Sequence, residues 1–421
     1  MRRPLLIILI FIITIAYFTT SNPKLNNEYS NDIVSVKGIV KGQIEKDKYD
    51  EYKVDRFLVR DYSRMKKLEV GKIVEINGEF KSLDEMKYED FDYGRYIKST
   101  GCKGIIYIKS YKNIGENKIY TFLNQIKTNT RSTLRYLYKN NSDFINSILI
   151  GEKENLTQEE KKVFSKTGTS HIIAISGFHV GILCGVVAFI MKKINRFYKL
   201  IVLILIMMLY SLMVGSPPSI IRAVVFMIIL YMAVFLDRKR DSLSTLSVIG
   251  IFLITNNPYI IYNVSFQLSF LATLSIIYFY GYINDKVKVS IISLTLSSNI
   301  LTLPIVYYNF KGIPLISIIG NIVIVPFMAI IMYLSIISVI SFSINIWIAK
   351  SIAYFNRIII NSIYFLLEKV SNIDFAYIEI DNPKKYYVII YYIIVFSYMI
   401  YKELKVMKEQ ENELQGYYKE Y

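Results

Sequence analysis

The chain has 421 residues, of which 53% are hydrophobic, and its mean hydropathy is +0.34. This composition excludes an ordinary soluble domain, because the apolar residues come in runs long enough to cross a bilayer. The formal charge of +16 favours an anionic partner such as nucleic acid, but the Lys-rich usage of an AT-rich genome explains it equally well. Cys102 lies in a polar region and Cys184 in an apolar run, which disfavours a disulfide and gives no metal-ligand spacing.

Residues 1–20 pair Arg2 and Arg3 with an apolar run, which is the pattern of either a signal peptide or a first membrane anchor. Because no clear small-residue cleavage site follows, we interpret this segment as an uncleaved anchor with its arginines in the cytoplasm. The same rule then places residues 21–120 outside the cell.

Residues 21–120 contain short alternating stretches separated by Gly, Asp and Lys clusters, at 33–40, 57–59, 73–76 and 104–108. This pattern predicts a small OB-like β-barrel, a fold that binds single strands through a basic face and stacked aromatic rings. The segment holds 20 Lys and Arg against 17 Asp and Glu, so a basic groove must come from side-chain arrangement and not from net charge. A lid or folding module is an equally good interpretation.

Residues 121–166 have the pattern of amphipathic, interfacial helices on the outer surface. Thr157 followed by Glu160 is a capping-box signature. A short helix should therefore run from Thr157 toward Phe164 and lead the chain into the next segment.

Residues 167–401 form the predicted polytopic domain, so the expected fold class is an α-helical polytopic membrane protein with an N-terminal extracellular small β-barrel. Apolar runs predict spans near 171–191, 199–215, 218–236, 242–256, 260–281, 288–307, 314–340 and 386–401. A further run at 344–367 either lies in the interface or lines a polar interior, because one helical face carries Lys350, Arg357, Asn361 and Glu368.

Counting 344–367 as a span gives a topology in which both termini are cytoplasmic. The basic clusters at 192–199 and 237–241 and the tail at 402–421 then all face the cytoplasm. The turn-forming, almost uncharged ends of the spans lie on the outer side, where the segment beginning at Gly168 also starts.

Polar side chains within the spans are costly in lipid and therefore mark candidate functional positions. The candidates are Gln267, Ser269, Asn299 and Asn321. Ordinary interhelical hydrogen bonding, worth about 1 kcal/mol or less for each side chain, is the simpler interpretation of them.

Two further residues within the spans are candidate functional positions. Pro304, like other Pro and Gly within the spans, predicts a broken helix beside a central polar cavity. Arg222 lies four residues after Pro218, where its guanidinium either reaches water or pairs with a phosphate backbone.

Both histidines of the chain lie in the segment GTSHIIAISGFHVG at 168–181. On one continuous helix His171 and His179 would be about 12 Å apart along the axis and could not share a metal ion, although a break at Gly177 would relax this. Ser176 and His179 would share a face, which raises an intramembrane Ser-His hydrolase as an alternative to hydrogen-bonding imidazoles in a channel wall. No third, orienting residue is identifiable.

The segment GTSHIIAISGFHVGIL closely resembles the signature of the ComEC-type competence proteins, which usually has Leu where this chain has Phe178. Further segments agree in order and spacing: LIGEKENL at 149–156, GSPPSIIRAVVF at 215–226, NPYIIYNVSFQLSFLAT at 257–273, and LPIVYYNFKGIPLISIIGNIVIVPF at 303–327. Upstream, FDYGRYIKSTGCKGIIYI at 91–108 resembles the end of the family's extracellular domain, so the resemblance covers nearly the whole chain.

The resemblance implies an exported OB-like domain and a helical competence domain that conducts single-stranded transforming DNA across the cytoplasmic membrane of a bacterium. With Asn299, the positions that match the family's patterned residues are candidates for the DNA path: His171, Ser176, Gly177, His179, Arg222, Gln267, Ser269, Pro304 and Asn321. Longer family members continue into a metallo-β-lactamase-like domain. We expect this chain to be a short form without it, and therefore neither an enzyme nor a holder of a cofactor or metal.

No phosphate-binding loop of the GxxxxGK type occurs in the sequence, so ATP-driven pulling has to come from a partner. We expect single-stranded DNA, a cytoplasmic DNA translocase ATPase, an extracellular DNA receptor and membrane lipids as partners. A separate nuclease and a second copy of the chain are open alternatives. So is a third interpretation, in which a competence-like protein serves the envelope without DNA uptake.

Overall fold

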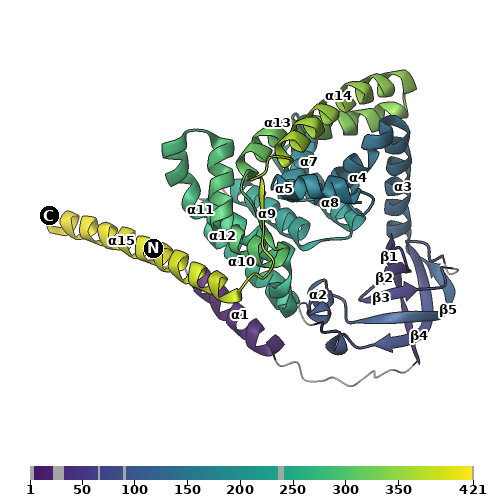
Figure 1. Cartoon of the computed structure of the whole chain (residues 1–421), viewed down its shortest axis with the longest axis horizontal. Helices are drawn as coiled ribbons and strands as arrows, with labels where there is room; N and C mark the ends of the chain where they lie inside the picture. Colours follow the sequence, from purple (N-terminus) through teal and green to yellow (C-terminus); the bar gives the residue numbers. More distant parts are fainter. Residues whose placement is uncertain (1–3, 22–32, 65–66, 89–91, 236–240, 420–421) are drawn as a thin grey trace.

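The computed structural model describes residues 4–21, 33–64, 67–88, 92–235 and 241–419. An N-terminal helix, a five-stranded barrel and a large body of helices follow one another along the chain (Figure 1). The expected fold class is therefore confirmed. The predicted basic residues at 2–3 and most of the cluster at 237–241 lie outside the described residues.

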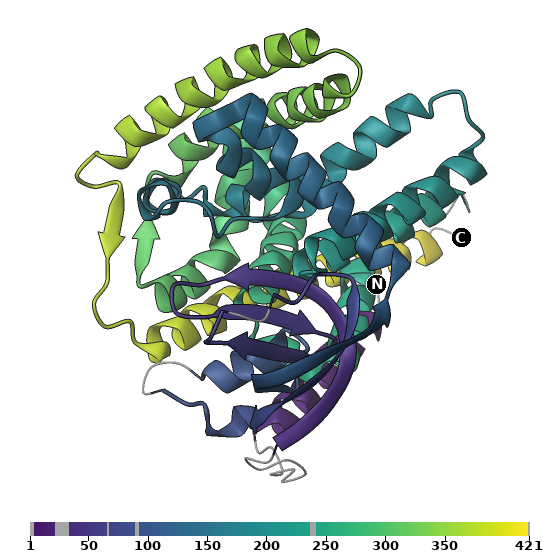
Figure 2. The ribbon, with the colours of Figure 1, turned by 90° about the vertical axis from the view of Figure 1, so that its right-hand side faces the viewer.

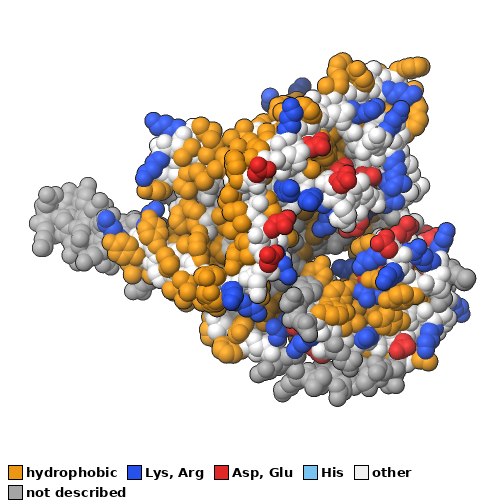
Figure 3. All heavy atoms as spheres, in the orientation of Figure 1, with side chains coloured by type: hydrophobic (Ala, Val, Ile, Leu, Met, Phe, Trp, Pro, Cys, Tyr) orange, Lys and Arg blue, Asp and Glu red, His pale blue; other side chains and the backbone are white. Residues whose placement is uncertain are grey.

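Six helices among the described residues are long and apolar enough to cross a membrane. They are α1 (Pro4–Ser21), α8 (Arg196–Val214), α11 (Val264–Val287), α12 (Ser290–Phe310), α13 (Ser317–Phe342) and the part Lys385–Lys405 of α15 (Lys385–Lys419). Shorter apolar helices accompany them: α7 (Gly177–Ile190), α9 (Pro218–Phe235) and α10 (Ser242–Asn256). Hydrophobic side chains form a broad surface over α11, α12 and α15, whereas charged side chains lie over the barrel and over the part of the body around α5 and α14 (Figure 3).

The barrel consists of β1 (Ile33–Glu45), β2 (Asp50–Val54), β3 (Phe57–Asp61), β4 (Lys72–Lys81) and β5 (Gly104–Glu116). Its closed order β1-β2-β3-β5-β4, with β1 paired back to β4 and β3 parallel to β5, is that of an OB-type barrel. Each predicted stretch lies in one of these strands. The sequence did not reveal β2, because three of its five residues, DEYKV, are charged.

The barrel core follows from the alternation of side chains along the strands. Val74 and Ile76 on β4 point inward and share the barrel core with Val40 of β1, Tyr52 of β2 and Val59 of β3, all of them fully or almost fully buried. Because every second residue of the predicted stretches is apolar, one face of each strand can fill this core while the other carries the charges.

A short helical segment, η1 (Leu83–Glu85) followed by α2 (Tyr93–Ser99), fills the connection between β4 and β5. Asp92 caps α2 by accepting a hydrogen bond of 2.8 Å from the backbone N–H of Arg95. A Cβ atom on Gly94 would lie 1.8 Å from the carbonyl oxygen of Leu83, so only glycine allows α2 to pack this closely on η1. In Figure 2 the barrel stands in front of the helical body, with α2 at its lower side.

Three helices lead from the barrel into the body: α3 (Lys118–Tyr138), α4 (Ser142–Ile150) and α5 (Gln158–Lys166). The predicted capping box at the start of α5 is confirmed. The backbone N–H of Glu160 donates to Thr157 Oγ1 at 3.1 Å, and the backbone N–H of Thr157 donates to Glu160 Oε2 at 2.8 Å. The small sheet of β6 (Gly312–Pro314) and β7 (Tyr377–Glu379) lies beside α5.

The run at 344–367 belongs to α14 (Ile346–Ser371), which is not among the six long apolar helices. Its buried face packs along α13 through Ala349, Ala353, Asn356, Ile360, Ile363 and Leu367. The spacing of three and four residues in that list is the signature of one helical stripe. Asn356 is the polar member of this stripe.

Breaks at the prolines were expected, and this expectation is wrong for α12 and α13. Both helices continue through their prolines, Pro304 and Pro326. At Pro304 the lost N–H leaves the carbonyl of Ile300 without its regular helical partner. The hydroxyl of Tyr391 on α15 donates to that carbonyl at 2.9 Å, so a neighbouring helix replaces the missing bond.

Candidate nucleic-acid path

The histidine segment is not one continuous helix. A short helix, α6 (Ser170–Ile173), ends before Ala174, and α7 begins at Gly177 with extended backbone at Ser176. The span expected from 171 therefore starts later, and the break considered at Gly177 is present. His171 on α6 is exposed, whereas His179 on α7 is fully buried. The two imidazoles therefore have different surroundings.

Ser176 and His179 form the first turn of α7. The Nδ1 atom of His179 accepts from the backbone N–H of Ser176 at 3.2 Å and lies 3.0 Å from the Oγ atom of Ser176. A nitrogen that accepts an N–H bond is unprotonated, so these contacts assign the proton of a neutral imidazole to Nε2. His179 thus takes the place of the Glu or Gln that closes a capping box at the third helical position.

The other nitrogen of His179 is buried without a described hydrogen-bond partner. A Ser-His hydrolase orients its imidazole with a carboxylate or amide side chain on that nitrogen, and among the described residues no such side chain contacts it. Among the described residues, no three His, Cys, Asp or Glu side chains gather to hold a metal ion. In the structure, Ser176 and His179 cap the N-terminus of α7 directly after the break.

On one side, the segment packs directly on the N-terminus of α13. Gly168 has a φ of +68°, and a Cβ atom there would lie 2.5 Å from the Cβ atom of Ser317. A Cβ atom on Gly320 would lie 2.4 Å from the carbonyl oxygen of Thr167. Two glycines, one on each partner, therefore let the turn before α6 touch the helix backbone.

On the other side, the break is held by the start of α9. Ser219 Oγ donates to the carbonyl of Ile175 at 3.0 Å, which satisfies one of the acceptors that the break exposes. A Cβ atom on Gly177 would be 3.4 Å from the Cβ atom of Ala223, which is an ordinary van der Waals distance, so α7 packs against α9 here with room for an alanine.

Arg222 precedes Ala223 on α9 and points to α11. One of its Nη atoms donates to the carbonyl oxygen of Ser269 and, at 2.7 Å, to Thr273 Oγ1. Both acceptors are neutral, so these contacts leave the guanidinium charge uncompensated, and a guanidinium has five N–H donors. Arg222 can therefore hold its position and still bind an anion. Ser269 takes part through its backbone and not through the hydroxyl that the sequence suggested.

The remaining candidates make helix-to-helix or local contacts. Asn299 Nδ2 donates to Ser317 Oγ at 3.1 Å, and Asn321 Nδ2 donates to Thr295 Oγ1 at 3.1 Å, so both join α12 to α13. The Oδ1 atom of Asn321 is buried without a described partner. Gln267 Nε2 donates to the carbonyl of Ile261 at 2.7 Å, within its own segment.

These contacts bring part of the candidate set together. The histidine segment lies between α13 and α9, with Asn299 connected through Ser317 on one side and Arg222 one residue from the packing contact on the other. Gln267 and Pro304 serve the local structure of α11 and α12 instead. The sequence selects the segment as a candidate, and only the structure separates residues next to the break from residues that support the surrounding helices.

A basic hollow precedes the histidine segment and was not found from the sequence. It has a volume of about 430 Å³ and lies between α5 and β7, with Lys161, Lys162, Lys166, Tyr377 and Glu379 among its lining residues. β7 joins α5 only through folding, more than 200 residues along the chain, so no local pattern could reveal the hollow.

The barrel carries a cluster of aromatic rings and cations, which we call the aromatic face: Lys46, Tyr49, Arg60, Tyr62, Tyr93 and Tyr107. The guanidinium of Arg60 lies 4.8 Å from the ring centre of Tyr49 and 5.6 Å from that of Tyr93. The ring of Tyr62 is 5.0 Å from Tyr49 and 5.9 Å from Tyr107, and Tyr62 is 55% exposed. The set comes from several elements: Lys46 and Tyr49 lie in the β1–β2 loop, Arg60 on β3, Tyr62 directly after β3, Tyr93 on α2 and Tyr107 on β5. Strand β3 and the β1–β2 loop belong to the surface through which OB-folds bind oligonucleotides.

The charges of the aromatic face are held in a fixed arrangement. Glu51 accepts from Arg60 Nε at 3.0 Å and from Lys46 Nζ at 2.9 Å. Burial alone would lower the pKa of Arg60 and of Lys46, but the interactions with Tyr93 and Glu51 for Arg60, and with Glu51 for Lys46, raise both values overall. Both residues therefore stay cationic, and one carboxylate leaves the cluster with a net positive charge.

Fold and site together define a multi-pass membrane protein with an OB-type barrel beside a helical body, in which a break separates α6 from α7. Residues 148–405, more than half of the chain, match the family described as Competence protein. The chain belongs to this competence protein family, as the resemblance to ComEC-type proteins implied.

Individual relatives agree with this assignment. The chain is 32% identical over 245 residues to ComE operon protein 3 of Bacillus subtilis (strain 168), which covers 56% of this chain and 31% of that protein. It is 22% identical over 267 residues to Recombination protein 2 of Haemophilus influenzae, covering 57% of this chain and 33% of that protein. In both cases the match spans about a third of the relative's length. No solved structure matches the chain significantly.

Proposed function

We propose that this protein passes single-stranded DNA across the cytoplasmic membrane during natural competence. Membership of the competence protein family and the names of the relatives, a ComE operon protein and a recombination protein, support a role in DNA uptake. The observation that carries the finer proposal is Arg222, a cation that neutral groups hold beside the interrupted helix in the apolar body.

The chemistry of a moving strand favours this arrangement. A strand needs a wet path with weak, repeated contacts, because tight binding at any one point would stall it. A single guanidinium can contact successive phosphates without holding any of them permanently. The hydroxyl and amide groups around the break, such as Ser176 and Asn321, offer further weak hydrogen bonds.

The aromatic face is the proposed first contact of the strand. Its exposed ring, Tyr62, can stack on a base, and such stacking contributes about 1–3 kcal/mol for each base without requiring a particular sequence. Lys161, Lys162 and Lys166 in the basic hollow supply a second group of cations immediately before the histidine segment. Cations at both places would attract the phosphate backbone.

The proposed topology places the barrel outside the cell and both chain termini in the cytoplasm, following the positive-inside rule. In this arrangement we assign boundaries at 1–20 for the anchor, 21–120 for the barrel domain, 121–166 for the interfacial helices, 167–401 for the channel and 402–421 for the tail. A DNA receptor outside and a translocase ATPase inside would complete the pathway, with membrane lipids around the body. A separate nuclease and a second copy are further proposed partners.

The test compares Arg222→Gln with Arg196→Gln, a variant at an exposed arginine at the start of α8. Cells receive labelled DNA, and DNA bound outside is scored separately from DNA that reaches the cytoplasm. We expect Arg222→Gln to lower import at least about tenfold while external binding stays unchanged, because removing a partly buried charged contact costs more than about 1.4 kcal/mol. Normal import in Arg222→Gln would contradict the proposal.

A second function is favoured by one observation, the 3.0 Å contact between Ser176 Oγ and His179 Nδ1. This contact is also the one that an intramembrane Ser-His hydrolase would use to activate its nucleophile.

An envelope role without DNA uptake predicts that a clean deletion leaves DNA import unchanged. The deletion strain therefore serves as the reference for every variant.

A further inference from the structure

The barrel and the helical body meet at a joint that the sequence did not reveal. On the barrel side it consists of α2, and on the body side of η3 (Pro258–Tyr262) together with the first turn of α11. Asn257 precedes η3 and Asn263 precedes α11, so the two asparagines lie at the two helix starts that face the barrel.

Asn257 uses both atoms of its side-chain amide. Its Oδ1 accepts from the backbone N–H of Tyr259 at 3.2 Å and so caps η3. Its Nδ2 donates to the carbonyl oxygens of Lys98 at 2.9 Å and Ser99 at 3.2 Å, which are the last two carbonyls of α2. The carbonyl of Lys98 also accepts from the backbone N–H of Gly101 at 3.0 Å, whereas the last carbonyls of a helix otherwise depend on partners outside it. One side chain therefore bonds to the ends of two helices from different parts of the fold.

Asn263 repeats the arrangement six residues later. Its Oδ1 accepts from the backbone N–H of Phe266 at 3.1 Å and caps α11, while its Nδ2 donates to Ser99 Oγ at 3.1 Å. Asn263 is 5% exposed and Ser99 2% exposed, so water does not compete for this bond. An aspartate would cap the helix equally well but has no N–H to donate. The geometry therefore requires an amide at both positions.

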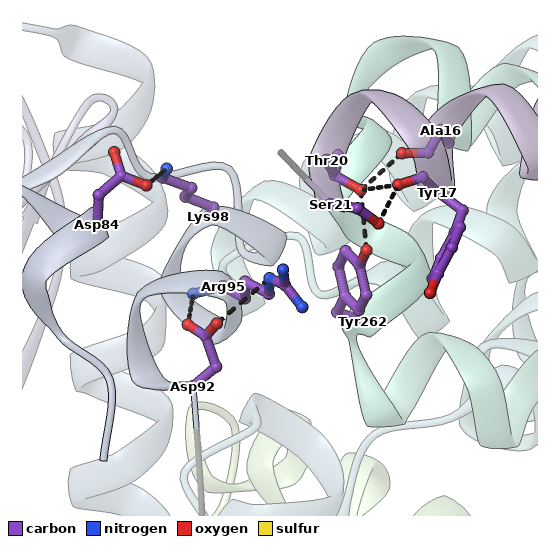
Figure 4. A network of polar contacts seen from close by, with 9 residues as sticks. All are labelled: Ala16, Tyr17, Thr20, Ser21, Asp84, Asp92, Arg95, Lys98 and Tyr262. Atoms are coloured by element: carbon purple, nitrogen blue, oxygen red, sulfur yellow. Dashed lines mark hydrogen bonds and ion pairs between the residues drawn. The ribbon is translucent and has the colours of Figure 1, made fainter. Parts of the chain in front are cut away.

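Cations and rings surround these bonds, and Figure 4 shows the arrangement around Tyr262. The guanidinium of Arg95 lies 4.9 Å from the ring centre of Tyr262, and Lys98 Nζ lies 5.1 Å from that of Tyr259. The hydroxyl of Tyr262 is 2.9 Å from Thr20 Oγ1, which brings α1 into the joint (Figure 4). Three separate parts of the chain are thus fixed at one place.

Each side of the joint also carries part of the proposed DNA path. On the barrel side, α2 holds Tyr93, whose hydroxyl accepts from Arg60 in the aromatic face. On the body side, α11 provides Ser269 and Thr273, the two residues that hold Arg222. Only the length of α2 separates the joint from the aromatic face, and less than three turns of α11 separate it from Arg222.

We propose that Asn257 and Asn263 are positioning residues that fix the aromatic face relative to Arg222, so that a strand bound by the barrel is delivered to the helical body. This inference rests on the proposed function. Helix capping uses only the oxygen atoms of the two asparagines in the NPYIIYN segment. The proposed role explains why each side chain also carries an N–H donor.

The test replaces Asn257 by Asp, which keeps the cap on η3 but places a second carboxylate oxygen against two carbonyl oxygens. The matched control is Asn345→Asp, because Asn345 caps α14 through Oδ1 and contacts no part of the barrel among the described residues. Spin labels at Lys109→Cys on the barrel and Ser290→Cys on α12, both exposed, report the barrel-to-body distance in nanodiscs. The native cysteines are buried and should not react.

We expect Asn257→Asp to broaden the distance distribution and to lower DNA import about tenfold, while binding of a single-stranded oligonucleotide changes less than about twofold. Asn345→Asp should match the wild type in all three measurements. If Asn257→Asp fails to accumulate, Ser99→Ala removes the acceptor of Asn263 with a smaller disturbance and should shift the distance and import in the same direction.

Two results would overturn the inference. An unchanged distance distribution in both Asn257→Asp and Ser99→Ala would show that the asparagines do not position the barrel. A broadened distribution with normal import would show that the position does not matter for delivery. Failure of the proposed function has a different signature, since the deletion strain and Arg222→Gln would then import DNA normally; the spin-label distance would still decide whether the joint fixes the barrel.

Discussion

His179 illustrates how one side chain permits two chemical interpretations. Its contact with Ser176 resembles a nucleophile beside its base, yet the same Nδ1 atom accepts a backbone N–H and closes a helix cap. Glutamine is a regular occupant of the third position in a capping box, and its amide oxygen can accept that bond. Substitution by glutamine therefore separates capping from catalysis.

We expect His179→Gln to retain at least about half of the DNA import of the wild type, whereas His179→Ala loses most of it, because alanine leaves the N–H of Ser176 unsatisfied at a cost of about 1 kcal/mol or more. Both variants are compared by labelled-DNA import at matched protein levels. Ser351→Ala, at an exposed serine of α14, serves as the control. Equal, complete loss in His179→Gln and His179→Ala would instead favour the hydrolase.

At the scale of elements, α12 keeps its helical course at Pro304 because α15 supplies a hydrogen bond. We expect Tyr391→Phe to lower the free energy of unfolding by about 0.6–1 kcal/mol, the usual range for such bonds in membrane helices. In a Pro304→Ala background the loss should almost vanish, because the new N–H of residue 304 then serves the carbonyl of Ile300. Denaturant unfolding in micelles of the four variants of this cycle measures the coupling.

The neighbouring tyrosine provides the matched control for this cycle. Tyr392 donates to the carbonyl of Leu301 at 2.8 Å, and in a regular helix that carbonyl already has the N–H of residue 305 as its partner. Tyr392→Phe should therefore cost the same with proline or alanine at position 304. Equal coupling for both tyrosines would contradict the assignment of Tyr391 to the proline defect.

The contact of α14 with α13 and α3 depends on a buried polar cluster around Asn356. Its Nδ2 lies 3.1 Å from the hydroxyl of Tyr138, 2.9 Å from Ser335 Oγ and 3.1 Å from the carbonyl of Ile331. We expect Asn356→Ala to lower the free energy of unfolding by about 2 kcal/mol, because these groups are left in a dry core. Unfolding in micelles measures the loss.

Asn361 lies on the same helix and supplies the comparison for Asn356. Its Oδ1 accepts from Asn141 Nδ2 at 2.6 Å at an exposed position, where water can replace the bond. Asn361→Ala should stay within about 0.5 kcal/mol of the wild type. Similar losses at the two positions would mean that burial does not determine the energy of the cluster.

At the scale of the whole molecule, the net charge and the barrel charge have different meanings. The chain has a net charge of +16, but the segment 21–120 is nearly balanced, with 20 cations against 17 anions. We therefore expect oligonucleotide binding to depend weakly on salt, with a slope of log K against log salt of about −2, as for roughly three neutralised phosphates. Fluorescence anisotropy with the full chain in nanodiscs measures this slope.

The same titration separates stacking from charge. Tyr62→Ala should weaken binding by about 1–3 kcal/mol without changing the slope, because a ring and not a charge is removed. Tyr111→Ala, at an exposed ring on β5, should leave both quantities unchanged. A slope several times steeper would mean that phosphate contacts dominate and that the aromatic face is not the binding surface.

Much of the architecture follows from the sequence because its signals are local. The capping box at Thr157, four of the five strands and the positions of the apolar helices each depend on residues a few positions apart. The joint does not, because Asn257 and its acceptor Lys98 are 159 residues apart and every asparagine before a helix looks like a simple cap. The same limit applies to Tyr391, whose partner at Ile300 is 91 residues away.

The contact that docks α1 on the helical body can form only late in the synthesis of the chain. Thr20 and its partner Tyr262 are 242 residues apart, so at about 5–20 residues per second the first helix waits roughly ten to fifty seconds for its neighbours to leave the ribosome. Its uncharged, apolar surface, buried only at Leu9, Ala16 and Thr20, lets it rest in lipid meanwhile. The barrel strands end at Glu116, long before Asn257 is synthesised, so the barrel is free to fold before the joint forms.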